Sequence, residues 1–246
     1  RVQLSRQCCA RAEAYGVLLY CNTFTPSEVR IITENPEFAA RLPKLFHKAF
    51  SLRFDQTPEG DGRGKLIFRI TRQEKLRRIV DLLGYDPSLV LHVNFGLLED
   101  ECCRTAFMRG AFLAGGSVTD PEKRYHLELA TSHMQASREV SALLTEMGFV
   151  PHSVRRSGSS VIYFKQSEHI EDFLTAIGAP LASWADVTLL TGRDSHTIYG
   201  NAIFSRVADT ALVDMLYMGV ILSGYGRFST ALDESGRMIR DRVFEN

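Results

Sequence analysis

Cysteine is the residue type in this chain whose placement could most directly do chemistry, because thiolates bind soft metal ions and form disulfides. Four of the five cysteines form adjacent pairs, Cys8 with Cys9 and Cys102 with Cys103, and the fifth is Cys21. Neighbours on a helix point about 100° apart, so one adjacent pair is poorly placed to chelate an ion. We therefore expect reduced structural thiols in a reducing cytoplasm, with a metal site as the alternative.

Other residue types that could carry catalysis show no shared pattern. SGYGRF (223–228) has a lone G-x-G without the third glycine of a phosphate loop, and no serine stands in a G-x-S-x-G context. Seven histidines occur without the spacing typical of metal ligands: His47, His92, His126, His133, His152, His169 and His196. We expect no catalytic residue, no cofactor and no metal.

Charge is balanced over the chain but uneven along it. The 29 Lys and Arg equal the 29 Asp and Glu in number, which argues against a strongly basic nucleic-acid-binding domain. Residues 41–78 nevertheless hold eleven Lys and Arg against four Asp and Glu. This segment is either a solvated face or a surface that follows a phosphate backbone. No apolar run suits a membrane span or a signal peptide, so we expect no membrane partner and a cytoplasmic location.

The chain repeats itself at an offset of 94 residues. RQCCARAEAYGVLLYCNTF (6–24) aligns without a gap on DECCRTAFMRGAFLAGGSV (100–118), which places Gly16 on Gly110. Each copy continues with alternating strand patterns and ends in a helix, QEKLRRIVDLLG (73–84) in one and SEHIEDFLTAIG (167–178) in the other. The repeat predicts an α+β fold of two pseudo-symmetric αββαββα units that pack through a two-helix interface.

The predicted boundaries follow from this alignment. We expect a first repeat at residues 1–86, a linker at 87–99, a second repeat at 100–181 and a divergent tail at 182–246. Within the repeats, Asn35 is a favourable N-cap before Pro36, and Thr71-x-x-Glu74 reads as a capping box. Glycines at the ends of the final helices, Gly84 and Gly178, are typical C-terminal stops.

Small residues mark the helix with which each copy begins. Ala106, Gly110 and Ala114 share one helix face, and Ala12 and Gly16 repeat the pattern in the first copy. A glycine inside a helix costs about 1 kcal/mol relative to alanine and is tolerated where two backbones must approach closely. We predict that the two helices pack through these stripes around a pseudo-twofold axis within a monomer.

These motifs resemble the LAGLIDADG homing endonucleases and, more specifically, the WhiA family of bacterial sporulation and cell-division regulators. RGAFLAGGS (109–117) takes the place of the LAGLIDADG signature. The patterns CCxRxxxxGxxxxxN and CCRTAFMRGAFLAGGSVTDPEKRYHLEL resemble WhiA in particular, and the resemblance covers roughly residues 1–181. It implies a degenerate nuclease domain in a nucleoid-associated, DNA-binding transcription regulator that is not an enzyme.

The same resemblance identifies where the acids of a nuclease would stand. In active LAGLIDADG enzymes each interface helix ends in a carboxylate, and the two carboxylates hold Mg²⁺. Aligning the glycines puts Cys21 and Gly115 at these positions, so we expect no DNA cleavage. The alternative is an active Mg²⁺-dependent endonuclease with a repurposed site that uses Glu28 or Asp120.

By the same resemblance, double-stranded DNA would lie along the strands and contact their basic side chains. Strand residues alternate in direction, so about half should point away from DNA. The candidates are Arg30, Arg53, Arg63, Lys65, Arg69, Arg155, Arg156 and Lys165. Most belong to the first copy, which predicts weak binding by this domain alone. The alternative is a protein-interaction module that does not bind DNA.

The segment 183–246 does not continue the repeat. It has no lysine, holds six Arg against eight Asp and Glu, and does not resemble the helix-turn-helix domain with which WhiA proteins end. We expect either a replacement of that domain or an abnormal end.

Overall fold

The computed structural model describes residues 4, 6–58, 64–85, 91–119 and 126–178. The predicted tail and the linker residues 87–90 therefore lie outside the described residues, as do Arg63 and Asp120. The first copy contains α1 (Gln7–Tyr20), β1 (Thr23–Phe24), β2 (Val29–Thr33), α2 (Pro36–Phe50), β3 (Leu66–Ile70) and α3 (Gln73–Leu83).

The second copy follows a short 3-10 turn, η1 (Phe95–Leu97), and has the same order of elements with one strand more. It contains α4 (Glu101–Gly115), β4 (Gly116–Val118), β5 (Leu127–Thr131), α5 (Met134–Glu146), β6 (His152–Arg156), β7 (Ser159–Phe164) and α6 (Ser167–Ala176). Within these stretches no helix has the length and apolar character needed to cross a membrane.

Each copy builds one antiparallel sheet, with strand order β1-β2-β3 in the first and β4-β5-β7-β6 in the second. The predicted α+β fold with a two-helix interface is confirmed. The first copy differs in one respect, because an isolated bridge between Gln56 and Arg69 stands where the second copy has β6. Pro58 and the glycines that follow it disfavour a longer strand there.

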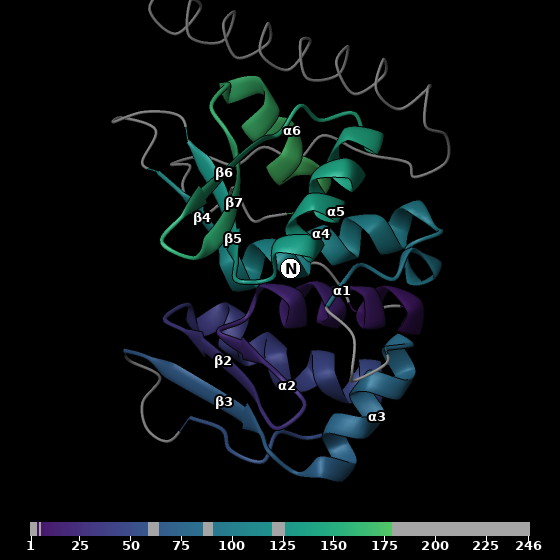
Figure 1. The fold of residues 1–246 in the computed structure, drawn as a ribbon. Coiled ribbons are helices and arrows are strands. Elements are labelled where there is room, and N and C mark those ends of the chain that lie inside the picture. Colours follow the sequence, from purple (N-terminus) through teal and green to yellow (C-terminus); the bar gives the residue numbers. More distant parts are fainter. Residues whose placement is uncertain (1–3, 5, 59–63, 86–90, 120–125, 179–246) are drawn as a thin grey trace, which may run out of the picture. The chain divides into compact units, whose positions relative to one another are not determined.

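Helices cover one face of each sheet. The side chains that point into the core are those of Val29, Ile31, Phe68 and Ile70 in the first copy and that of Leu129 in the second. Figure 1 shows both sheets on the same side of the α1–α4 pair. The face of each sheet opposite these buried residues is called here the open face.

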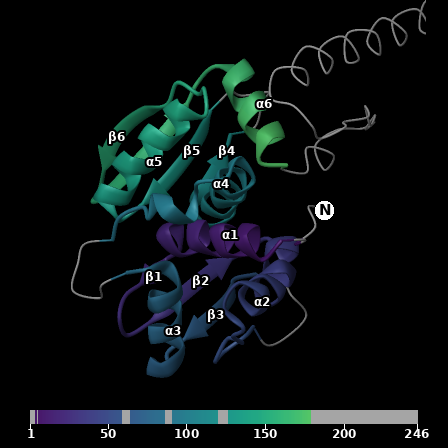
Figure 2. The ribbon, with the colours of Figure 1, turned by 90° about the vertical axis from the view of Figure 1, so that its right-hand side faces the viewer.

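The two interface helices touch backbone to backbone. A Cβ atom on Gly16 would lie 2.0 Å from the carbonyl oxygen of Phe107, and one on Gly110 would lie 1.9 Å from that of Glu13. Both separations are far below contact distance, so only glycine permits this approach. The helices run in the same direction, since Tyr20 at the end of α1 lies beside Gly115 at the end of α4. Figure 2 shows α1 and α4 next to each other, between the sheets of the two copies.

The other small residues of the predicted stripes lie on the same two helices. Ala12 and Ala106 are buried, whereas Ala114 is half-buried.

A buried ion-pair network joins the two copies beside this contact. Glu13 on α1 is 1% exposed, and its carboxylate accepts hydrogen bonds from Arg41 Nε at 2.5 Å and Nη2 at 2.8 Å. Arg109 Nη1 on α4 donates to the same carboxylate at 3.2 Å. A buried carboxylate needs such partners, because an unpaired one would be strongly destabilising.

The chain between the copies is fixed to both of them at residues 92–94. The Tyr15 hydroxyl donates to the carbonyl oxygen of His92 at 2.7 Å and accepts from the backbone N–H of Asn94 at 2.7 Å. The Glu139 carboxylate on α5 accepts from the N–H of Val93 at 2.5 Å. This part of the connection is therefore a structured contact.

Helix ends agree with the sequence at three positions. The Asn35 side chain accepts from the N–H groups of Glu37 and Phe38, which confirms it as the N-cap of α2. Gly84 and Gly178 have φ of 67° and 64°, the left-handed conformation expected of glycine after a helix.

The predicted capping box at Thr71 and Glu74 is wrong. The N-cap of α3 is Arg72, whose side chain makes no capping bond. Asp55, distant in sequence, accepts instead from the N–H groups of Thr71 at 2.8 Å and Arg72 at 2.9 Å, and pairs with Lys75. Desolvation alone would raise the pKa of Asp55, but these bonds, led by that of Lys75, lower it to about 2.

Gly16→Ala should destabilise the chain by at least about 3 kcal/mol, because the added methyl group meets the rigid backbone of α4. Thermal or urea unfolding followed by circular dichroism measures the loss. The matched control is Gly96→Ala, whose Cβ would meet only the side chain of Asn94, at 3.2 Å. An equal loss in both variants would contradict the close backbone contact.

Asp55→Asn should lower the free energy of unfolding by about 1–2 kcal/mol at pH 7, because the side chain that binds the N–H groups before α3 and pairs with Lys75 loses its charge. The pKa of Asp55 is lowered on folding, so its stabilisation is present above pH ~4 and is lost as the pH falls towards ~2. The difference between wild type and variant should shrink over that range. Asp81→Asn, the same change at an exposed site on α3, is the matched control and should leave the free energy of unfolding at pH 7 close to that of wild type.

Candidate nucleic-acid interface

Two predicted DNA-contacting arginines meet on the open face of the first sheet. Arg30 and Arg69 are direct partners in the β2–β3 register, and Lys65 precedes β3 in the same alternation. Arg30 Nη2 donates to Thr23 Oγ1 at 3.0 Å. Arg69 Nε lies 3.6 Å from Glu28 Oε1, so part of its charge is neutralised.

The open face of the second sheet centres on Tyr163 of β7. Its register partners are Glu128 on β5 and His152 on β6. The His152 ring stacks on the tyrosine ring with centroids 5.3 Å apart, and Lys165 Nζ lies 5.3 Å from the ring centroid. This face thus combines an aromatic platform with a cation.

Glu128 reduces the positive charge of this second face. Its Oε1 accepts from His126 Nε2 at 2.6 Å and from Arg156 Nη1 at 2.8 Å. The hydrogen bond from His126, together with the charge of Arg156, lowers the pKa of Glu128. The carboxylate therefore stays ionised at neutral pH and forms an ion pair with Arg156, which is one of the predicted DNA contacts.

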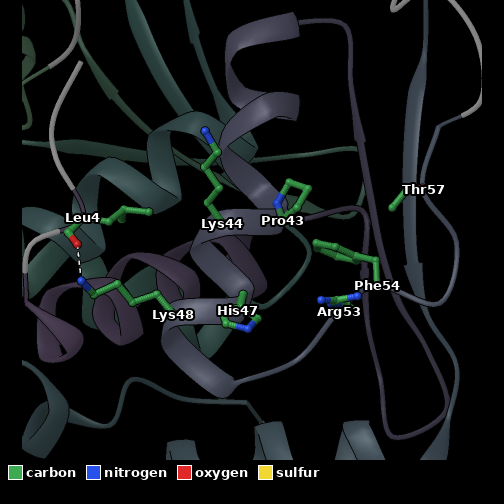
Figure 3. A pocket seen from close by; sticks show the side chains of 8 residues that line it. All are labelled: Leu4, Pro43, Lys44, His47, Lys48, Arg53, Phe54 and Thr57. Carbon is green, nitrogen blue, oxygen red and sulfur yellow. Dashed lines mark hydrogen bonds between the residues drawn. The ribbon is translucent and has the colours of Figure 1, made fainter.

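The structure places two other predicted contacts elsewhere. Arg155 alternates with Arg156 and points to the opposite face of the sheet from Tyr163. Arg53 lies in the loop after α2, on the helix side of the first sheet, where it lines a hollow of about 680 Å³ (Figure 3). The hollow is lined by Leu4, Pro43, Lys44, His47, Lys48, Arg53, Phe54 and Thr57. The basic segment is therefore divided between two surfaces.

The end of α1 carries a buried thiol, Cys21, where the resemblance leads us to expect one nuclease acid. Cys21 Sγ donates to the carbonyl oxygens of Leu18 at 3.3 Å and Thr23 at 3.2 Å. Burial raises the pKa of Cys21 to about 12, so the thiol is neutral at physiological pH. A neutral sulfur is a poor ligand for Mg²⁺, which prefers oxygen.

The end of α4 has no room for a side chain at the position of the other acid. A Cβ on Gly115 would lie 2.6 Å from the carbonyl oxygen of Ala130 and 3.0 Å from Tyr20 Cδ1. Nearby, Thr131 Oγ1 donates to the carbonyl oxygen of Leu19 at 2.6 Å. Packed backbone and the tyrosine ring therefore stand where a side chain on Gly115 would begin.

The two acids considered as replacements do not supply a site in the described part of the chain. Glu28 pairs with Arg69 at the sheet, and Asp120 falls outside the described residues.

Sequence reasoning treated each cysteine pair by itself and missed a cluster that both pairs form. The Sγ atoms of Cys8, Cys9, Cys102 and Cys103 all lie within 4.8 Å of one another. The repeat contained the signal, because a twofold axis between α1 and α4 brings equivalent residues near their N-termini together. Cys21 lies at the opposite end of α1.

Comparison with known proteins finds the WhiA LAGLIDADG-like domain at residues 104–188. A probable cell division protein WhiA from Ruminiclostridium cellulolyticum is 33% identical over 73% of this chain and 60% of its own length. Its counterpart from Alkaliphilus metalliredigens is 30% identical over 73% of this chain and 61% of its own length. The chain thus spans about three fifths of the length of these relatives.

Solved structures share the fold at low sequence identity. The crystal structure of the N-terminal LAGLIDADG domain of DUF199/WhiA has a TM-score of 0.58 at 19% identity and covers 75% of this chain and 90% of its own. Full-length DUF199/WhiA from Thermatoga maritima has a TM-score of 0.57 at 15% identity. The match covers 87% of this chain and 71% of that one. The homing endonuclease I-DmoI, solved with DNA and Mn, has a TM-score of 0.50 at 14% identity. The match covers 71% of this chain and 98% of that one.

Proposed function

Since this chain belongs to the WhiA family, we propose that it is a non-catalytic DNA-binding regulator of transcription in bacterial cell division and sporulation. The observation that carries the proposal is the set of cations on the two open faces, which lie on one side of the α1–α4 pair. The family names and the DNA complex of I-DmoI support it. The chain spans only part of its relatives, so the activity of the whole protein is included in the proposal.

The proposed contacts are to phosphates. Arg30, Lys65 and Arg69 on the first open face would follow one stretch of backbone, and Arg156 and Lys165 on the second another. Phosphate contacts orient a protein on a duplex without reading its sequence. Two of these arginines already pair with carboxylates, Arg69 with Glu28 and Arg156 with Glu128, so binding should be weak and sensitive to salt.

We also propose that the domain does not cut DNA. A hard cation needs oxygen ligands, and the two helix ends offer a neutral thiol and a glycine against which other atoms pack. The domain would thus keep the shape of a nuclease as a binding scaffold.

The proposed organisation is a monomer near the nucleoid, with repeats at residues 1–86 and 100–181, a linker at 87–99 and a separate segment at 182–246. The second candidate function is protein interaction without DNA binding. The basic hollow beside α2 favours it, because Lys44, Lys48 and Arg53 there would suit an acidic partner.

Fluorescence anisotropy with mixed-sequence duplex DNA tests the proposal. The chain should bind at low salt and lose affinity steeply as salt rises, without Mg²⁺-dependent cleavage on a gel. Arg30→Ala combined with Lys65→Ala should lower the salt slope by about one for each phosphate contact removed.

The control for this experiment is Arg155→Ala, which removes an exposed arginine from the opposite face of the second sheet. Its binding curve should match that of wild type. Flat anisotropy at low salt would reject DNA binding in favour of a protein partner, and cut DNA would reject the non-catalytic assignment.

Glu128→Gln should tighten DNA binding by roughly two- to tenfold at low salt, because it removes a negative charge and releases Arg156 to a phosphate. The same anisotropy titration measures the change. Glu146→Gln, the same substitution at an exposed position on α5, should leave affinity unchanged. Weaker binding by Glu128→Gln would exclude the second open face as the contact surface.

A further inference from the structure

Four cysteines from two distant parts of the chain converge at the N-terminal ends of the interface helices. Cys8 and Cys9 lie in the first turn of α1, and Cys102 and Cys103 lie in the first turn of α4. Every pair of their Sγ atoms is within 4.8 Å, and the Cys8–Cys9 pair is 3.9 Å apart. Thiols of both copies therefore meet at this end of the helix pair.

We propose that these four thiolates bind one structural Zn²⁺ ion that joins the two repeats. A tetrahedral Zn²⁺ with Zn–S bonds of ~2.3 Å places its sulfur atoms about 3.8 Å apart. The spacing in the cluster exceeds this by at most about 1 Å, which small side-chain rotations can close. A cluster of several iron atoms would hold its thiolates farther apart, so the spacing favours a single ion.

Without a metal, burial raises the pKa of Cys9 to about 12 and also raises the pKa of Cys103, so zinc would have to displace the protons of these two thiols as it binds. Two features of the surroundings act in the other direction. Both pairs lie at helix N-termini, where the helix dipoles stabilise negative charge. Arg6 Nη1 lies 3.9 Å from Cys102 Sγ and can offset part of the negative charge of a four-thiolate zinc site. Binding would release the thiol protons to solvent as the sulfur–zinc bonds form, without any change of oxidation state.

The twofold relation explains how adjacent cysteines can share one ion. Each helix presents its pair at equivalent positions, so the ion would lie near the axis and take two ligands from each side. Burial is graded across the site, because Cys103 is 3% exposed whereas Cys8 is exposed to solvent. Such a site can load from the surface and still be closed on its inner side.

The site is remote from the proposed DNA surface. The cysteines stand at the N-terminal ends of α1 and α4, whereas Cys21 and Gly115 stand at or beside the C-terminal ends. The role proposed for zinc is to hold the repeats together, and it does not depend on whether the domain binds DNA.

Metal analysis of the full-length chain tests this directly. The protein is purified under reducing conditions without chelator, and its zinc is counted by inductively coupled plasma mass spectrometry. We expect about one zinc per chain in the wild type and in Cys21→Ser, which removes the one cysteine outside the cluster. The Cys8→Ser and Cys103→Ser variants should hold much less zinc. Of the two, Cys8→Ser is the less able to disturb folding, because Cys8 is exposed.

Cobalt replacement provides a readout that does not depend on folding alone. Co²⁺ added to the reduced, metal-free chain should give the visible bands of a tetrahedral site and near-ultraviolet thiolate-to-cobalt absorption, both weakened in Cys8→Ser. The proposal is overturned if the reduced chain takes no zinc from a chromophoric chelator, or if Cys8→Ser and Cys103→Ser retain as much zinc as Cys21→Ser. A chain whose pairs form disulfides and that binds no zinc after reduction would point to redox chemistry instead.

Discussion

Contact between two helical backbones, at Gly16 and Gly110, sets the position of the other elements in the described part of the chain. Any larger residue would force α1 and α4 apart, because carbonyl oxygens lie within about 2 Å of where its Cβ would stand. Each helix leads directly into the first strand of its own sheet. The spacing of the helices therefore fixes the spacing of the sheets, and with it the distance between the cations on the two open faces.

The same closeness supports the proposal that the domain has no nuclease centre. A metal-binding pair of acids needs space for a side chain at each helix end. At Gly115 the backbone of Ala130 and the ring of Tyr20 lie where that side chain would begin. On α1, the Cys21 thiol donates to the carbonyl oxygen of Leu18, which the helix end leaves free, and to that of Thr23 in β1. Cys21 belongs to the hydrophobic core and Gly115 lies against backbone, so we expect that an acid placed at one of these positions would disturb packing before it bound a metal.

Sequence reasoning predicted the fold because the second copy of each pattern supported the first. Local features such as the Asn35 cap and the Gly84 stop were also readable, since they depend on neighbours within a few residues. Contacts between distant segments were not. Asp55 holds the two residues before a helix that begins at residue 73, Glu128 pairs with Arg156, and the cysteine pairs meet only across the axis. In each case the partner was visible in the sequence, but its proximity followed only from the packing.

The Glu13 network has a consequence for self-association. In the repeat alignment Glu13 corresponds to Phe107 and Arg109 to Tyr15, so the side chains around the axis are unlike although the backbones are equivalent. If α1 paired with α1 of another molecule, each buried carboxylate would lose Arg109 and keep only the cations of its own half. Losing a partner from a buried ion pair typically costs several kcal/mol. Each half thus pairs with the other half and not with its own kind, which disfavours association of two molecules through α1 with α1 in a crowded cell.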